Sequence, residues 1–81
     1  MTLHEDTLRW LERGNDMGAT HVLVLCDTIE WRYYPAFVMT GEDARKCVDE
    51  KSAQERTILT GLYKLSEDWQ TQLSQHRPFT L

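Results

Sequence analysis

The sequence predicts a small α+β domain in which a two-stranded antiparallel hairpin packs on a long C-terminal helix or helix pair, in the order α-β-β-α(α). Two runs of strand-forming residues, separated by a short polar stretch, predict the hairpin. Apolar residues at helical spacing precede the first run and follow the second. The length of 81 residues predicts a single domain, residues 1–81.

Residues 2–16 are expected to form the first helix. Apolar side chains recur there among charged ones at roughly helical spacing. Thr2 and Glu5 have the spacing of a capping box, in which each side chain accepts a hydrogen bond from a free amide of the first turn. Gly14 and Gly18 are typical of a helix C-terminus and the turn that follows it.

Residues 21–26 (HVLVLC) give the clearest strand, because the run is aliphatic and β-branched without interruption. No polar residue alternates within it, so both faces should be covered, one by helices and the other by a further layer such as a second copy of the chain. Residues 31–39 predict the second strand, connected through residues 27–32. Pro35 lacks an amide hydrogen and therefore places this strand at an edge or marks a bulge.

A helical pattern follows the hairpin. Thr40 or Gly41 is expected to cap a helix whose first turn carries carboxylates, which the helix dipole favours there. Apolar residues then recur in steps of three or four, at Ala44, Cys47 and Val48 and again at Ile58, Leu62, Leu65, Trp69 and Leu73. Polar residues near 50–53 interrupt the pattern, so the sequence allows either one long helix or two, ending before Pro78.

A hairpin of two strands is marginally stable by itself. It must therefore pack on the long helix, or pair edge to edge with another copy to make a four-stranded sheet. A chain of this length buries a small core, and association with a partner would add to its stability. We favour a homodimer.

The charge balance bears on the class of partner. Thirteen acidic and nine basic residues give a net charge of -4, which disfavours nucleic acid; a basic protein surface or a small molecule is electrostatically easier to bind. Cys26 and Cys47 have no paired spacing and are expected to be reduced and buried, so no metal or cofactor is predicted. Residues 1–6 are polar and acidic, and the longest apolar run, 22–26, is too short to cross a bilayer, which favours the cytoplasm.

The candidate binding residues surround the predicted hairpin connection. Polar side chains follow the first strand, where sites often lie, and the aromatic and guanidinium groups beside them are types enriched at interfaces. The set is Asp27, Thr28, Glu30, Trp31, Arg32, Tyr33 and Tyr34. The alternative for Asp27 and Thr28 is the commoner one, a hydrogen bond from a nearby backbone amide that shapes the turn. The alternative for the aromatic residues is that one face is core and the other a homodimer contact.

Cys47 is the one candidate nucleophile. Arg45 and Lys46 flank it and would lower its thiol pKa, but a nucleophile also needs a base. His21 is the nearest candidate by topology, although the spacing does not bring the two together. The histidines are too scattered to predict a metal site, and the common nucleotide, hydrolase and protease signatures do not occur in the sequence. The prediction is a protein that is not an enzyme.

Three segments resemble a group of small uncharacterised proteins of bacteria and their phages. They are residues 18–28 (GATHVLVLCDT), 34–39 (YPAFVM) and 41–43 (GED), and the group's helical tail ends in a Q-L-x-x-H-R pattern similar to residues 72–77. The sequence departs from the group at residues 29–33, where the group has a more acidic connection. The resemblance implies a shared fold and a bacterial or phage setting, and it brings no assigned activity.

The leading functional hypothesis is therefore a small binding protein that engages a protein partner through the hairpin connection. In a phage setting it would be an accessory protein or inhibitor acting on a host protein in the host cytoplasm, by analogy with other small phage proteins. The alternative is a protein that binds or sequesters a nucleotide-like small molecule, with Asp27 and Thr28 contacting its polar groups and a tyrosine stacked on its ring. The third hypothesis is an enzyme that uses Cys47 or Asp27.

Overall fold

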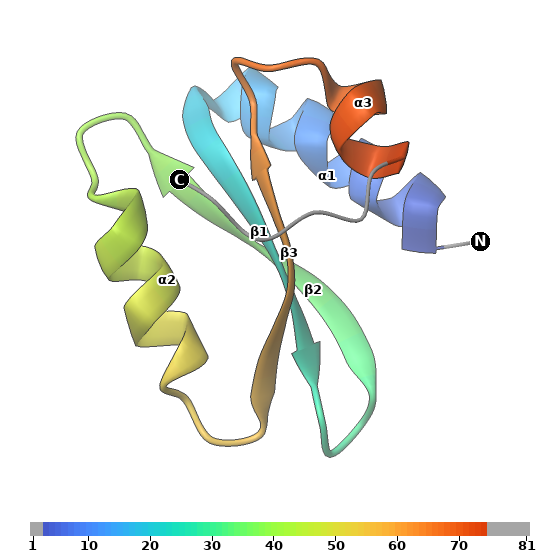
Figure 1. The fold of residues 1–81 in the computed structure, drawn as a ribbon, viewed down its shortest axis with the longest axis vertical. Coiled ribbons are helices and arrows are strands. Elements are labelled where there is room, and N and C mark those ends of the chain that lie inside the picture. Colours follow the sequence, from blue (N-terminus) through green and yellow to red (C-terminus); the bar gives the residue numbers. More distant parts are fainter. Residues whose placement is uncertain (1–2, 75–81) are drawn as a thin grey trace.

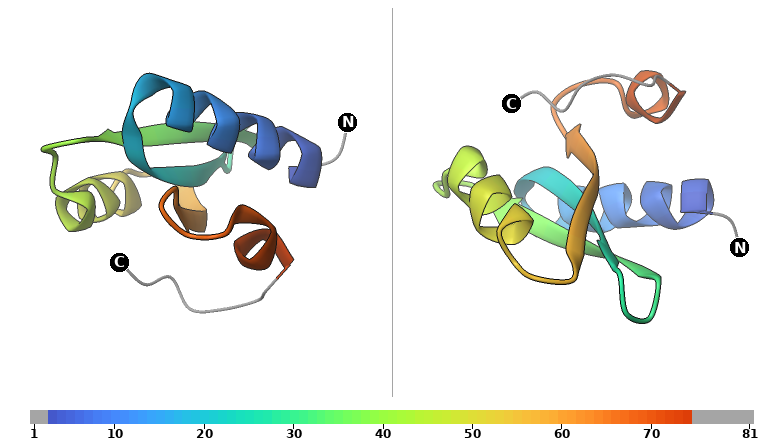
Figure 2. Two further views of the ribbon diagram at one scale, coloured as in Figure 1. Left: turned by 90° about the horizontal axis from the view of Figure 1, so that it is seen from above. Right: turned by 60° about the horizontal axis from the view of Figure 1, so that its bottom comes forward.

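The computed structural model describes residues 3–74, which form three helices and one antiparallel sheet. The order along the chain is α1 (Leu3–Met17), β1 (Ala19–Asp27), β2 (Arg32–Met39), α2 (Ala44–Ser52), β3 (Thr57–Lys64) and α3 (Trp69–Ser74). The strand order is β2-β1-β3, so the aliphatic strand β1 is central. α1 and α3 lie to one side of the sheet and α2 to the other (Figure 1; Figure 2 shows the same layers from two further directions).

The predicted long C-terminal helix is wrong, because its middle is the third strand, β3. The helical pattern counted Ile58 and Leu62, four residues apart, on one face. In the sheet the β1–β3 register shifts between Val24 and Leu25, and an extra residue in β3 turns the rest of the strand over. Ile58 and Leu62 therefore lie on opposite faces, whereas Leu59 and Leu62, three residues apart, share the face under α2 because of the bulge.

Local chemistry explains why a strand forms there. The stretch is rich in β-branched residues, and Gly61 in its middle disfavours a helix by about 1 kcal/mol relative to alanine. Thr60, the additional residue at the bulge, donates its hydroxyl hydrogen to the Val24 carbonyl oxygen at 3.0 Å. A Cβ at Gly61 would lie 2.8 Å from the Tyr63 ring, so the bulge also needs glycine for space.

α2 is a short helix that begins and ends by itself. Asp43, and not Thr40 or Gly41, is its N-cap, and the Asp43 side chain accepts hydrogen bonds from the amides of Arg45 and Lys46. The helix ends at Ser52, within the interval 50–53 in which the sequence allowed a break. The expected helix end at Pro78 lies outside the described residues.

Both faces of β1 are covered within one chain. On one face, Leu23 packs with Val38 and Leu62 under the apolar side of α2. On the other, Val22 and its β2 partner Phe37 lie against α1 at Gly14. The second layer expected from another copy is therefore α2, and β3 replaces the expected four-stranded sheet across a dimer.

Gly14 is a point at which α1 packs closely against the sheet. A Cβ there would lie 2.9 Å from Val22 Cγ2 and 3.2 Å from Phe37 Cδ1, so glycine is needed for packing and not to end the helix. The helix runs on to Met17, and Gly18, with φ of 83°, adopts the left-handed conformation that ends it.

Pro35 lies in β2 at an edge of the sheet, as its missing amide hydrogen predicted. It pairs with Val24 of the central strand. The opposite edge of the sheet belongs to β3.

Candidate functional site

The connection between β1 and β2 and the start of β3 lie at the same end of the sheet. The Thr28 amide donates a hydrogen bond to the Arg56 carbonyl oxygen at 2.8 Å and ties the two segments together. The hairpin extends beyond α1 and α3 at this end (Figure 1). No helix of residues 3–74 therefore covers the α1 side of the sheet there.

That uncovered face carries a row of side chains across all three strands. Tyr33 of β2 pairs with Cys26 of β1, which pairs with Ile58 of β3, and cross-strand partners share a face. Cys26 is only 4% exposed, while Tyr33 is 44% and Ile58 50% exposed. The turn adds Ile29 at 58% and Trp31 at 70%. We call Ile29, Trp31, Tyr33 and Ile58 the hairpin-end surface.

The structure separates the aromatic residues that the sequence grouped. Tyr34 pairs with Leu25, so it faces the α2 side of the sheet, opposite to Tyr33. It is half-buried, and its hydroxyl lies 3.4 Å from Thr57 Oγ1. Of the two alternatives drawn from the sequence for this strand, the core role fits Tyr34, while Tyr33 stays largely open to solvent.

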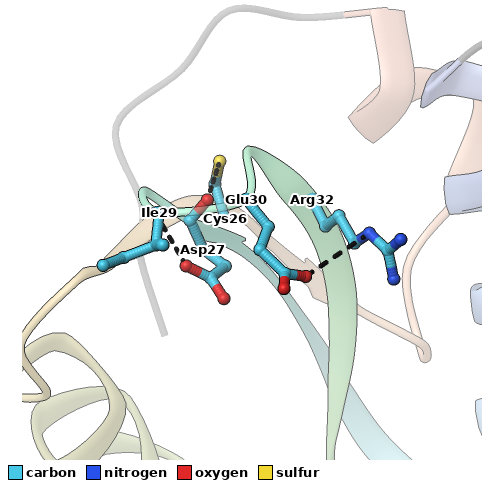
Figure 3. Close-up of polar contacts among 5 residues, drawn as sticks. All are labelled: Cys26, Asp27, Ile29, Glu30 and Arg32. Carbon is cyan, nitrogen blue, oxygen red and sulfur yellow. Dashed lines mark hydrogen bonds and ion pairs between the residues drawn. The ribbon is translucent and has the colours of Figure 1, made fainter.

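The polar candidates mainly shape the turn (Figure 3). Asp27 Oδ1 accepts a hydrogen bond from the Ile29 amide at 2.8 Å, which is the turn role predicted as the commoner alternative. Arg32 Nε lies 3.6 Å from Glu30 Oε2, and both side chains are exposed, so this ion pair contributes little to stability.

Two residues at this end have left-handed backbone conformations without being glycine. Trp31 has φ of 56° and Arg56 φ of 65°. Such conformations are unfavourable for bulky residues and tend to occur where the surrounding structure holds a loop for a functional reason. The strain thus coincides with the exposed apolar side chains.

A shallow hollow of about 290 Å³ opens beside the same turn. Its lining brings together carboxylates from the end of β1, from the turn after β1 and from the loop before β3, with one cation and the first residue of β3. The residues are Asp27, Ile29, Glu30, Glu55, Arg56 and Thr57. A cationic group would be favoured in it over an anionic one.

Sequence reasoning missed Ile58, Glu55 and Arg56, since the segment that carries them was assigned to a helix. The β-branched run around Gly61 was the signal that could have placed them at a sheet edge. With β3 beside β1, these residues join the predicted set at one end of the molecule.

Cys47 is not arranged as a nucleophile. Burial, followed by the nearby carboxylates Glu42, Glu50 and Asp43, raises the pKa of its thiol, so the expected lowering by Arg45 and Lys46 is wrong. The thiol stays protonated at neutral pH. Within residues 5–74, no group of histidine, cysteine and acidic side chains is placed to hold a metal ion.

Comparisons with protein-family models, with curated protein sequences and with solved structures find no match to the chain. None of the helices in the described part of the chain has the length and apolar character needed to span a membrane.

Proposed function

We propose that the chain is a small protein-binding domain whose docking site is the hairpin-end surface. The single observation that carries this proposal is the concentration of large exposed apolar side chains at the end of the sheet that extends beyond α1 and α3. Exposed apolar patches of this kind are typical of interaction sites, and tryptophan and tyrosine are the residues that most often dominate binding energy.

The turn contacts support a preformed site. Asp27 fixes the start of the turn, and the Thr28 amide fixes the turn against the loop before β3. Trp31 is therefore presented from a turn whose first part is fixed by these two hydrogen bonds. Little ordering of this surface is needed on binding, which lowers the entropic penalty of association.

The surrounding charges favour a partner with basic groups. The hollow beside Ile29 is lined by more carboxylates than cations, in a chain of net charge -4. Positive groups beside an apolar patch on the partner would steer the encounter. The narrower hypothesis that the partner is a host protein rests on the sequence resemblance alone.

The small-molecule alternative has weaker support. Ligand sites usually enclose most of the ligand in an apolar cleft, whereas this hollow is shallow and has a mostly charged lining. Of the two tyrosines that the sequence offered for stacking on a ligand, Tyr34 contacts Thr57 on the other face of the sheet.

The test is affinity capture from a host-cell lysate by the wild-type chain, by Trp31→Ala and by Met17→Ala. Met17 is 47% exposed at the other end of β1, about 30 Å away along a nine-residue strand, and serves as the matched control. We expect Trp31→Ala to lose a protein that both other forms retain, by at least tenfold in recovered amount, which corresponds to the loss expected for a dominant interface residue.

The melting temperature of each form separates binding from folding. Trp31 is 70% exposed, so Trp31→Ala should melt within a few degrees of the wild type. Equal capture by Trp31→Ala and Met17→Ala would refute the proposal. A large loss of stability in Trp31→Ala would instead assign the indole ring to the core and refute it as well.

A further inference from the structure

Within the described part of the chain, the outer edge of β3 is unpaired for most of its length. β3 is an edge strand, and within residues 3–74 no other strand pairs with that side. The opposite edge, β2, carries Pro35 and so lacks one donor. β3 is thus the edge better able to accept another strand.

The hydrogen-bond pattern shows which backbone groups point outward. Arg56 and Leu65 point towards β1: the Thr28 amide donates to the Arg56 carbonyl oxygen, and the Leu65 amide donates to the Thr20 carbonyl oxygen. In an antiparallel pair the residues alternate between bonding the partner and pointing away. We follow this alternation from Arg56 and from Leu65 towards the bulge at Thr60. The residues whose backbone N–H and C=O groups point outward are then Thr57, Leu59, Leu62 and Lys64.

The backbone of Lys64, the last of these outward positions, is already hydrogen-bonded by the side-chain amide of Gln72. The Lys64 amide donates to Gln72 Oε1 at 2.8 Å, and Gln72 Nε2 donates to the Lys64 carbonyl oxygen at 2.8 Å. The Gln72 side chain is 4% exposed and takes the place of one peptide group of a neighbouring strand. The outward backbone groups at this end of β3 are therefore already paired. A peptide group of another strand has the same donor and acceptor as the Gln72 amide and matches the outward groups along the rest of the edge.

The open part of the edge leads into the hairpin-end surface. Ile58 belongs to both, and the hollow of Asp27, Glu30 and Glu55 begins beside Thr57. A chain laid along β3 would place one side chain next to half-exposed Ile58 and its end at the carboxylates. Continuity and charge together specify an extended segment with an apolar residue and a lysine or arginine.

We propose that the β3 edge from Thr57 to Leu62 docks an extended basic segment of the partner protein, which adds as a strand to the sheet. Backbone hydrogen bonds to Thr57, Leu59 and Leu62 supply affinity, and Ile58 with the acidic hollow supplies selectivity. This mode of binding rests on the proposed function for its partner, and it adds the chemistry that the partner must present.

The test uses the acetylated, amidated peptide KVTVTVK, which carries a lysine at each end so that one reaches the hollow in either strand direction. Binding to the full chain is followed residue by residue in 1H-15N spectra with amide hydrogen exchange. We expect slower exchange at the Thr57, Leu59 and Leu62 amides and a dissociation constant of about 1 mM or below, since short strands bind weakly.

Two control peptides separate the contributions. One is N-methylated at alternate residues, which keeps the side chains and removes the backbone donors; its affinity should fall roughly tenfold, as expected for the loss of one or two hydrogen bonds. The other, EVTVTVE, should bind more weakly because it puts glutamates at the acidic hollow.

Equal binding of the N-methylated and unmethylated peptides would overturn strand addition, as would the absence of any change at millimolar peptide. Protection of the edge amides that grows with protein concentration before peptide is added would make a second copy the occupant and would also overturn it. The loss of capture by Trp31→Ala would survive each of these results, so strand addition and the proposed function fail separately.

Discussion

Trp31 combines exposure with an unfavourable backbone conformation, a combination that a surface residue seldom has. It is 70% exposed, and its φ of 56° lies in the left-handed region. A structure that served stability alone would favour glycine or asparagine at such a position. This combination supports the proposal that the Trp31 indole ring is a binding contact.

A second single residue, His21, gives a prediction about how the stability of the fold depends on pH. Burial, followed by the charge of its cross-strand partner Lys64, lowers the pKa of the imidazole below 6.5, against a smaller opposing effect of Glu67. Below pH 6.5 the unfolded chain therefore takes up a proton that the folded chain does not. We expect the free energy of unfolding to be unaffected by this group above pH 6.5 and to decrease as the pH falls from 6.5 towards the folded-state pKa.

Denaturant titrations of the wild type and of His21→Asn at several pH values between 7.5 and 5 test this. The variant should show a smaller fall in stability over that interval, because its side chain does not titrate there. Identical slopes for the two proteins would contradict the assignment.

At the scale of secondary-structure elements, the Gln72 side chain connects α3 to β3. Its buried amide satisfies both backbone groups of Lys64 and also reaches the Glu67 and Asp68 carbonyl oxygens at 3.4 and 3.3 Å. Gln72→Ala should lower the free energy of unfolding by about 1–3 kcal/mol, because buried groups lose their partners. Urea unfolding measures this.

Gln70→Ala is the control for that variant, since Gln70 lies in the same helix with its side chain exposed. Its stability should remain within about 0.5 kcal/mol of the wild type. Equal effects of the two substitutions would mean that α3 is not fixed to the β3 edge by the Gln72 amide.

The elements that the sequence predicted well are those whose pattern has one interpretation. An uninterrupted aliphatic run such as residues 21–26 fits a central strand, and Pro35 fits an edge. β3 was missed because its apolar residues do not alternate: the bulge at Thr60 places Leu59 and Leu62, three residues apart, on one face, which is also a helical spacing. A single-sequence pattern does not contain the pairing partner that reveals a bulge.

The candidate site was predicted in part for the same reason. Trp31 and Tyr33 are contiguous with the predicted turn, so sequence position was enough to find them. Ile58 and the Glu55 carboxylate reach the site only through pairing of β3 with β1, which the sequence reading did not include. Tyr34 was included because alternation along a strand does not reveal which face is covered.

At the scale of the whole molecule, residues 3–74 cover both faces of β1 with helices of the same chain, and among these residues the hairpin end and the β3 edge have no such cover. A two-stranded hairpin would have needed a second copy of the chain to complete its sheet. Here β3 and the helices of the same chain complete the sheet and cover it. The core and the proposed binding surface then lie in different parts of the molecule. Substitutions on the hairpin-end surface can therefore be tested for binding without unfolding the domain.

Site-specific photo-crosslinking in cells that produce the protein tests the central proposal, that the hairpin-end surface binds a partner protein. A photoreactive phenylalanine analogue would replace Trp31 in one form and Met17 in another. The account predicts a discrete crosslinked protein from position 31 and none from position 17, because Met17 lies at the other end of β1. Equal crosslinking from both positions, or none from position 31 in a folded protein, would contradict it.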